Sequence, residues 1–253
     1  MSTVFADYFS SLANSYRRYR PSYPPAVFRF LADNAPSNEV ALDIGAGNGQ
    51  AAAGLAHWFE RVIAFDPSEE QIAHALPTAG VEFHVGRAED IPVRDECADV
   101  ITVAQSLHWF DQAAFFQEAE RVLKPGGLLA VLVYGRLQVD PDIDVVIEDY
   151  YLNVVGDHWP TERKLVESGY EAIQLPFEPL EAPPIEMRVK WTFDELLGYL
   201  ETWSASKRWR DAQDADDVFA TDSIRPLLEP LWGEETRRVI SFPLEFSVHQ
   251  KPR

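Results

Sequence analysis

Residues 40 to 50 read Val-Ala-Leu-Asp-Ile-Gly-Ala-Gly-Asn-Gly-Gln, and this stretch decides the fold that we expect. An apolar strand ends near Asp43, and three glycines at alternate positions then turn the chain into a helix. This is how α/β folds bring bare backbone against a nucleotide-like ligand. The fingerprint of dinucleotide-binding folds requires glycine or alanine at position 50, where this chain has Gln50. The spacing therefore argues against a nicotinamide cofactor and favours a smaller adenosyl one.

Strands and helices alternate on both sides of this stretch, from residue 24 to residue 134. The alternation predicts an α/β fold with a mostly parallel sheet and helices on both faces. Four helices are predicted: one at 24–35, one that begins at about residue 49, one that begins after a cap at Ser68, and one at 112–123. Strands are predicted at 40–44, 62–65, 81–85, 99–104 and 128–134. Lys124-Pro125-Gly126-Gly127 is expected to end the last of these helices and turn the chain.

The pattern changes after Gly135. Helical segments are predicted at 141–155, 161–168 and 193–209, the last capped by Thr192; extended segments are predicted at 176–184, 186–191 and 239–248. Pro243 interrupts the last strand, which implies an edge position or a bulge there.

Composition narrows the choice of partners. The chain has 253 residues, 46% of them apolar and 25% charged, which is ordinary for a globular protein. Its net charge of −19 repels phosphate backbones and anionic lipid, so we expect no nucleic-acid or membrane partner. Arg17, Arg18 and Arg20 are a local exception that can receive an anion or form a solvated face. The single cysteine, Cys97, and a first segment unlike a signal peptide favour the cytoplasm.

Asp66 strengthens the case for a nucleoside ligand. An acidic residue at the end of the second strand, about twenty positions after the first glycine, can accept hydrogen bonds from both ribose hydroxyls. Taken separately, the glycine loop can be a packing turn and Asp66 a helix cap. Together they favour nucleoside binding.

Several blocks of the sequence resemble the class I S-adenosylmethionine-dependent methyltransferases. The matching blocks are residues 40–49, Phe65-Asp66-Pro67-Ser68, Gly86-Arg87-Ala88-Glu89-Asp90-Ile91-Pro92 and Glu120-Arg121-Val122-Leu123-Lys124-Pro125-Gly126-Gly127. A weaker resemblance points to the small-molecule branch that includes the trans-aconitate methyltransferases. It rests on Tyr19-Arg20-Pro21-Ser22-Tyr23-Pro24, Gln105-Ser106-Leu107-His108-Trp109-Phe110, Trp191-Thr192 and Leu200-Glu201-Thr202-Trp203-Ser204.

The resemblance implies a Rossmann-like sheet of seven strands in the order 3-2-1-4-5-7-6, the last one antiparallel. Residues 186–191 would be the sixth strand and the tail the seventh. It also implies one methyltransferase domain over 1–253, with a helical cap at 1–35, a cofactor-binding core at 36–135, an elaboration at 136–185 and a completing segment at 186–253.

The same resemblance implies where S-adenosylmethionine, and its product S-adenosylhomocysteine, would bind. The cofactor residues would be Asp43, Gly45, Ala46, Gly47, Asp66, Pro67, Ala88, Glu89 and Gln105. Gly45 to Gly47 would lie against the amino acid part, Asp66 at the ribose and Ala88 with Glu89 at the adenine. Arg87 departs from the family, in which many members have an acidic residue at that position.

Methyl transfer requires mainly a nucleophile held in line with the sulfonium in a dry site. A base is needed only where the acceptor must lose a proton. His108 is the candidate catalytic base because it follows the fourth strand at the carboxyl edge of the sheet, although it can equally fix its loop or line the site passively.

The candidate substrate-binding residues are Tyr16, Arg20, Tyr23, Trp109 and Trp203. Single aromatic residues more often belong to the core, but as a group these can cover the site. Arg20 can pair with a carboxylate, so an acidic acceptor is plausible. No histidine spacing suggests a metal.

The expected function is methyl transfer to a small molecule through a carboxylate or hydroxyl oxygen. The alternative is a regulatory protein that binds the cofactor or its product without catalysis. The sequence indicates neither the acceptor nor the oligomeric state.

Overall fold

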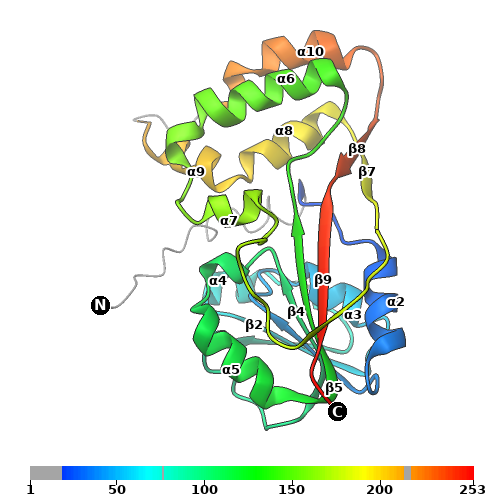
Figure 1. Ribbon diagram of the computed structural model, residues 1–253. Coiled ribbons are helices and arrows are strands. Elements are labelled where there is room, and N and C mark those ends of the chain that lie inside the picture. Colours follow the sequence, from blue (N-terminus) through cyan, green and yellow to red (C-terminus); the bar gives the residue numbers. More distant parts are fainter. Residues whose placement is uncertain (1–18, 76, 214–217) are drawn as a thin grey trace. The chain divides into compact units, whose positions relative to one another are not determined.

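The computed structural model describes residues 19–75, 77–213 and 218–253. The chain folds into two compact units, each built from several segments. Of the described residues, the sheet unit takes those within 22–135, 164–187 and 243–253, and the helical unit takes those within 19–21, 136–163 and 188–242. Figure 1 follows the chain through these segments by colour.

In the described residues, the sheet unit holds a seven-stranded sheet in the order β3-β2-β1-β4-β5-β9-β6. The parallel strands are β1 (Val40–Ile44), β2 (Arg61–Asp66), β3 (Val81–Val85), β4 (Ala98–Ala104) and β5 (Leu123–Tyr134). The antiparallel strand β9 (Leu244–Gln250) pairs with β5 on one side and with β6 (Glu178–Leu180) on the other. The predicted Rossmann-like order is confirmed, with β6 and β9 as the sixth and seventh strands.

Residues 186–191 are not the sixth strand, so that assignment is wrong. They form β7 (Met187–Trp191), which pairs with β8 (Arg238–Phe242) in a separate two-stranded sheet. The sixth position belongs to the three residues of β6, inside the predicted extended run. Alternation in 186–191 correctly indicated a half-buried strand, but it carries no information about which sheet the strand joins.

Two further boundaries differ from the predictions. The tail is two strands rather than one, because it breaks at Pro243, where the chain passes from β8 to β9. A proline has no N–H for a ladder, so the break falls where pairing must change. Residues 124–127 stay within β5 rather than forming a separate turn, and Gly126 takes a positive φ of 80° inside the strand.

The helices of the sheet unit follow the predicted alternation. They are α2 (Pro25–Asn34), α3 (Gln50–Leu55), α4 (Glu69–Ala73) and α5 (Gln112–Val122), while α7 (Arg163–Glu167) begins at the unit boundary. The Ser68 hydroxyl accepts a hydrogen bond from the Gln71 N–H, 3.2 Å, so the predicted cap is confirmed. Figure 1 shows α2 and α5 on opposite sides of the strands.

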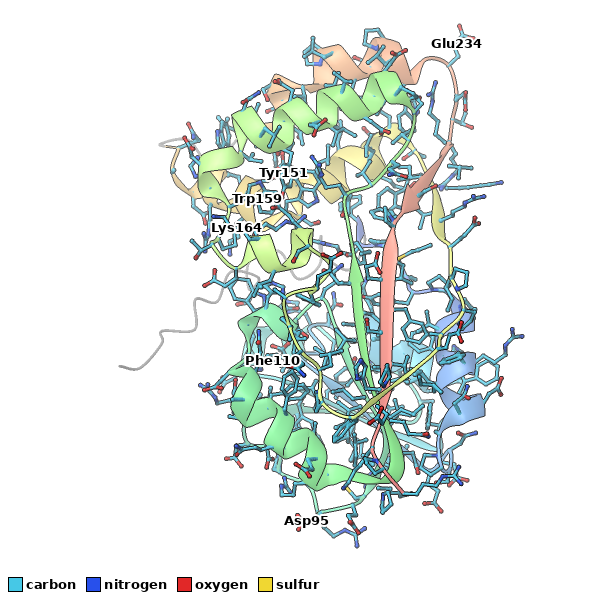
Figure 2. All side chains as sticks on the ribbon, in the orientation of Figure 1. Asp95, Phe110, Tyr151, Trp159, Lys164 and Glu234 are labelled. Atoms are coloured by element: carbon cyan, nitrogen blue, oxygen red, sulfur yellow. The ribbon has the colours of Figure 1, made fainter. Side chains whose placement is uncertain are left out.

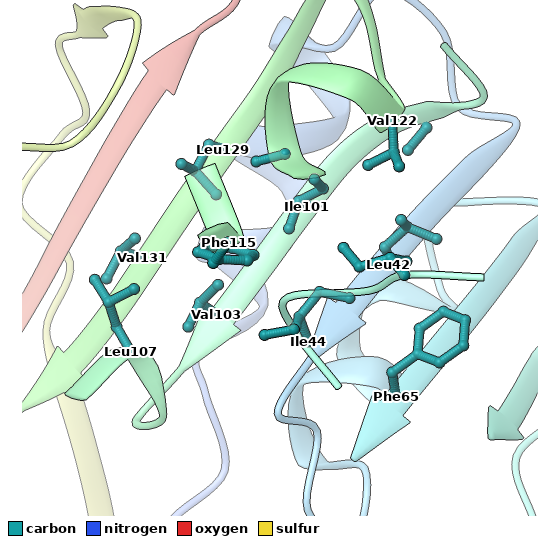
Figure 3. Packing of buried hydrophobic residues seen from close by; sticks show 14 of the residues in the cluster. Leu42, Ile44, Phe65, Ile101, Val103, Leu107, Phe115, Val122, Leu129 and Val131 are labelled. Carbon is teal, nitrogen blue, oxygen red and sulfur yellow. The ribbon is translucent and has the colours of Figure 1, made fainter. Parts of the chain in front are cut away.

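Side chains of successive residues in each parallel strand point to opposite faces of the sheet. Leu42, Ile44, Ile101 and Val103 belong to a buried cluster with Phe115 of α5, and Figure 3 shows these side chains on the same face of the strands. A strand buried on both faces loses water from every side chain, and each large apolar side chain then contributes about 1.5–3 kcal/mol. This packing holds the carboxyl ends of β1, β2 and β4 in fixed register.

The helical unit contains α6 (Pro141–Asp149), the π-helical turn Tyr150–Val154, α8 (Phe193–Glu201), α9 (Ser204–Asp211) and α10 (Arg225–Trp232). The predicted helix over 193–209 is two helices, since the chain leaves helical hydrogen bonding at Thr202–Trp203. Thr192 caps α8 in a reciprocal box with Glu195, as predicted. Among the described helices, none is long and apolar enough to cross a membrane.

Candidate cofactor and acceptor site

The loop after β1 can be built only from glycine at two of its positions. Gly45, Gly47 and Gly49 have φ values of 68°, 55° and 91°, in the left-handed region that other residues avoid. A Cβ on Gly45 would lie 2.5 Å from the Ser106 hydroxyl oxygen, and one on Gly49 would lie 2.6 Å from the Phe83 ring. Gly47 differs, since the one contact that a Cβ there would make with described residues beyond its chain neighbours is to the Gln71 side-chain oxygen, at 3.8 Å. The loop is therefore tightly packed at both ends and open beside Gly47.

Asp66 joins this loop to the end of β2. Its Oδ2 accepts a hydrogen bond from the Gly47 N–H, 2.8 Å, and its Oδ1 accepts one from the Ser68 N–H, 2.9 Å. The residue is 8% exposed. Each carboxylate oxygen has two lone-pair sites, so Asp66 can accept further hydrogen bonds from a ligand. The glycine loop and the Asp66 carboxylate are therefore in direct contact; that they bind one ligand stays a prediction.

Asp43 lies inside the protein beneath the loop. Its Oδ2 accepts from the Ala52 N–H of α3, 2.9 Å, and its Oδ1 from the Thr102 hydroxyl of β4, 2.8 Å. Complete burial raises the pKa of the Asp43 carboxyl to about 7; the two hydrogen bonds oppose that rise and the Asp66 charge adds to it. Asp43 thus fixes the helix to the strands under the loop.

The loop predicted to hold adenine also supports α5. Ala88 is buried, and the Glu89 carboxylate accepts from the Asp111 N–H at 2.9 Å, just before that helix. Arg87 donates to the same carboxylate at 3.2 Å while 68% of its side chain is exposed. The residue that departs from the family pattern therefore pairs with Glu89. Pro67, also predicted to bind the cofactor, is half-buried between Asp66 and Ser68.

Gln105 ends β4 in a strained conformation. Its φ is 58°, which is uncommon for a residue other than glycine. Its backbone N–H donates to Leu132 and its side-chain amide donates to the Tyr134 carbonyl, 3.0 Å, so β5 holds it in place. The next residue, Ser106, donates its hydroxyl to the Ile44 carbonyl at 3.1 Å. The glycine loop and the segment after β4 therefore meet at the carboxyl edge of the sheet.

His108 lies in the short helical turn that follows, Leu107–Trp109. Its Nδ1 is 2.7 Å from the Tyr170 hydroxyl, and its ring centroid is 4.7 Å from that of Trp109. Tyr170 is buried and has a φ of 64°, directly after Gly169, which ends the turn that follows α7. No sequence pattern predicts this partner, because the two residues are 62 positions apart and Tyr170 belongs to no periodic segment.

The predicted substrate residues divide between the two units. Tyr23 belongs to the sheet unit, where it packs at 6.2 Å from the Tyr134 ring. Trp203 belongs to the helical unit and is buried among Tyr150, Tyr151, Trp159 and Tyr199, with ring centroids 5.6–5.9 Å away. Figure 2 labels Tyr151 and Trp159 of this cluster.

Arg20 also belongs to the helical unit. It donates to the Thr202 carbonyl, 3.0 Å, and its guanidinium lies 5.3 Å from the Tyr199 ring centroid. Tyr16 lies outside the described residues. Within the described ranges, no group of three or more histidine, cysteine or acidic side chains is placed to hold a metal.

An adenosyl cofactor fits the residues at the sheet edge. The open backbone at Gly47 allows close approach, and the Asp66 carboxylate beside it has acceptor capacity for ribose hydroxyls. Gln105 and His108 stand on the neighbouring segment, which reaches the loop through Ser106.

Comparisons with known proteins found similar methyltransferases. A family model described as "Methyltransferase domain" matches residues 42–131. A candidate methyltransferase of Dictyostelium discoideum is 35% identical over 206 residues, which cover 80% of this chain and 78% of that protein.

Two solved structures were compared as well. A candidate type II methyltransferase from Anaeromyxobacter dehalogenans is 42% identical and superimposes with a TM-score of 0.84, covering 93% of this chain and 100% of that one. A Haemonchus contortus N-methyltransferase, solved with phosphomonomethylethanolamine and S-adenosylhomocysteine, is 18% identical with a TM-score of 0.51, covering 98% of this chain and 58% of that one. This second likeness concerns the fold alone.

Proposed function

Since this chain belongs to the methyltransferase family, we propose that it transfers a methyl group to an oxygen atom of a small molecule. S-adenosylmethionine is its cofactor, and it supplies an activated methyl group on a sulfonium. The observation that carries the proposal is the hydrogen bond that joins the glycine loop to Asp66. This bond places the Asp66 carboxylate beside the open backbone of Gly47 at the carboxyl edge of a parallel sheet. Ligands of such folds bind at that edge.

We assign the cofactor residues as follows. Gly45, Ala46 and Gly47 would face the amino acid part, Asp66 would accept from the ribose, and Ala88 with Glu89 would border the adenine. Asp43 would not contact the cofactor directly but would hold α3 in position through its hydrogen bond with the Ala52 N–H. Gln105 would stand at the methionine end, and its amide bond to Tyr134 would hold it there.

His108 has two possible protonation patterns, and they suit different acceptors. If Nδ1–H donates to the Tyr170 oxygen, Nε2 carries a lone pair and can take a proton from a hydroxyl acceptor. If the Tyr170 hydroxyl donates to Nδ1, Nε2 carries the hydrogen and can instead orient a carboxylate. A carboxylate acceptor needs no base, so in that case the site works by position and dryness.

The acceptor proposal rests on this pair. Tyr23, Trp109, Trp203, Arg20 and Tyr16 stay candidates for acceptor contacts. The excess of negative charge over the whole chain disfavours nucleic acid, and the single cysteine fits a cytoplasmic reaction. Resemblance to the trans-aconitate branch makes polycarboxylic acids the first acceptors to try.

The test is transfer of radiolabelled methyl from S-adenosylmethionine to a panel of small carboxylic acids, phenols and alcohols. We expect label in at least one of them. Tight binding of S-adenosylhomocysteine with no transfer to any member would contradict the proposal and favour a regulatory binding protein.

The role of His108 is tested on the acceptor so found. For a hydroxyl acceptor, His108→Gln should lower kcat about 100-fold, since glutamine cannot take the proton. Full turnover by this variant from pH 6 to 9 would exclude a base. For a carboxylate acceptor the same variant should change KM more than kcat.

A further inference from the structure

A buried glutamine beside the glycine loop has an acceptor oxygen that nothing in the described chain satisfies. Gln71 lies on α4 and is 4% exposed. Its backbone N–H takes part in the Ser68 cap, but its side-chain Oε1 is buried without a hydrogen-bond partner among the described residues. Buried polar atoms are nearly always paired in native proteins, because an unpaired one loses its bonds to water and regains none. An exception next to a binding loop suggests that the partner comes from the ligand.

The position of this oxygen indicates which part of the ligand it meets. Among the described residues other than its chain neighbours, a Cβ on Gly47 would approach one atom within 4 Å, Oε1 of Gln71, at 3.8 Å. The N–H of the same glycine donates to Oδ2 of Asp66 at 2.8 Å. Two acceptor oxygens, from β2 and α4, therefore flank Gly47, where the backbone is open to a ligand.

We infer that Gln71 is a further cofactor-binding residue, whose Oε1 accepts a hydrogen bond from one ribose hydroxyl while Asp66 accepts from the other. The inference rests on the proposed ribose role of Asp66. A ribose presents two adjacent O–H donors, and the two oxygens match them in number and in chemistry. If this side chain served only to fill space, an apolar side chain of the same size would be more stabilising, because it has no buried oxygen without a hydrogen-bond partner.

Gln71→Met separates these roles, because methionine keeps the length of the side chain and removes the amide. Calorimetric titration with S-adenosylhomocysteine should show affinity lowered about tenfold, the worth of one well-placed hydrogen bond. The melting temperature of the ligand-free protein should stay unchanged or rise. Gln117→Met, at an exposed glutamine on α5, is the matched control and should change neither quantity.

Deoxy analogues of S-adenosylhomocysteine identify the contact. Of the 2′-deoxy and 3′-deoxy analogues, one should bind equally well to the wild type and to Gln71→Met, because the hydroxyl that Gln71 contacts is missing. The other should still distinguish the two proteins. Gln71→Leu provides the same comparison if the methionine variant does not fold.

The outcomes are distinguishable. Unchanged affinity of Gln71→Met for S-adenosylhomocysteine, or an equal loss for both analogues with a lower melting temperature, would overturn the inference alone. Failure of the wild type to bind S-adenosylhomocysteine would instead overturn the proposed function.

Discussion

Gly45 is one of two loop residues, with Gly49, where backbone conformation and packing together forbid a side chain. Its φ of 68° is unfavourable for any residue with a Cβ, and a Cβ at this position would also lie only 2.5 Å from the Ser106 hydroxyl oxygen. Gly80 offers a comparison, since its φ is 81° but a Cβ there would come no closer than 3.7 Å to the nearest atom. The two positions separate the cost of the backbone conformation from the cost of the clash.

Gly45→Ala should therefore weaken S-adenosylhomocysteine binding at least about tenfold and lower the free energy of unfolding by about 2–4 kcal/mol. Gly80→Ala should lower the free energy of unfolding by only about 1–2 kcal/mol and leave affinity unchanged. Calorimetry and urea unfolding measure both quantities. Equal effects of the two variants on affinity would show that the loop is not part of the site.

Asp43 predicts a pH dependence of stability. Its pKa is about 7 in the folded protein and near 4 in the unfolded chain, so between these values only the folded state holds the proton. The contribution is complete below about pH 4, falls as pH rises through that window, and is lost above about pH 7. The loss is on the order of a few kcal/mol.

Asp43→Asn should remove this dependence. The asparagine oxygen can accept from Ala52, and its amide can donate to the Thr102 hydroxyl, which then donates to the Leu42 carbonyl. Urea unfolding at pH 5 and pH 8 should therefore show a smaller drop in stability for the variant than for the wild type. Identical drops would mean that Asp43 is ionised throughout.

At this scale the sequence predicted the tight turn at the three glycines and the Ser68 cap, because both depend on local backbone chemistry. It did not predict Tyr170 beside His108 or the unpaired oxygen of Gln71. Both depend on side chains brought together by folding, and no spacing in the chain encodes them.

At the scale of the elements, the Asp99 carboxylate joins the amino-terminal ends of strands β1 and β4. Asp99 is fully buried and accepts from the N–H groups of Glu39 and Val40 and from the Ser37 hydroxyl. Lys124 pairs with it at 2.8 Å. The residues that open β1, β4 and β5 therefore share one ionic centre at the end of the sheet away from the glycine loop.

Asp99→Ala should lower the free energy of unfolding by about 3 kcal/mol or more, since two backbone N–H groups lose their acceptor and the Lys124 ammonium loses one of its two carboxylate partners. The control is Glu82→Ala, which breaks an ion pair with Arg61 whose side chains are 46% and 52% exposed. That change should cost under about 1 kcal/mol. Comparable losses in urea unfolding would contradict this ranking.

Hydrophobic periodicity predicts long strands well and very short ones poorly. Four of the five parallel strands were predictable because each contains a short apolar run, and β3 because apolar and polar residues alternate along it. The three residues Glu178–Leu180 of β6 have too few positions to show a period, and Pro179 argues against a strand. Their pairing with β9 is decided by the register of that strand, which the local sequence does not specify.

At the scale of the whole molecule, each unit is assembled from segments far apart in the sequence. The sheet unit takes its last residues from 243–253, and β9 covers one edge of β5 over seven residue pairs. Residues 128–134 of β5 are all buried. An uncovered central strand of this kind is a template for association.

Deletion of residues 244–253 should therefore yield a protein that elutes as large aggregates and unfolds without a cooperative transition, by size-exclusion chromatography and urea titration. Ser247→Ala, an exposed change within the same strand, should behave as the wild type. A monodisperse and cooperative truncated protein would show that β9 is dispensable to the sheet.

The central claim is that the glycine loop and Asp66 together hold the nucleoside of S-adenosylmethionine. Calorimetric titration of S-adenosylhomocysteine into the wild type and into Asp66→Asn tests it most directly, with reduced nicotinamide dinucleotide as the ligand control. Asparagine retains one acceptor oxygen, so the Gly47 contact can persist while the charged acceptor for ribose is lost. We predict saturable binding to the wild type, at least about tenfold weaker binding to the variant, and none of the dinucleotide to either. Equal affinity of the two proteins for S-adenosylhomocysteine would contradict the account.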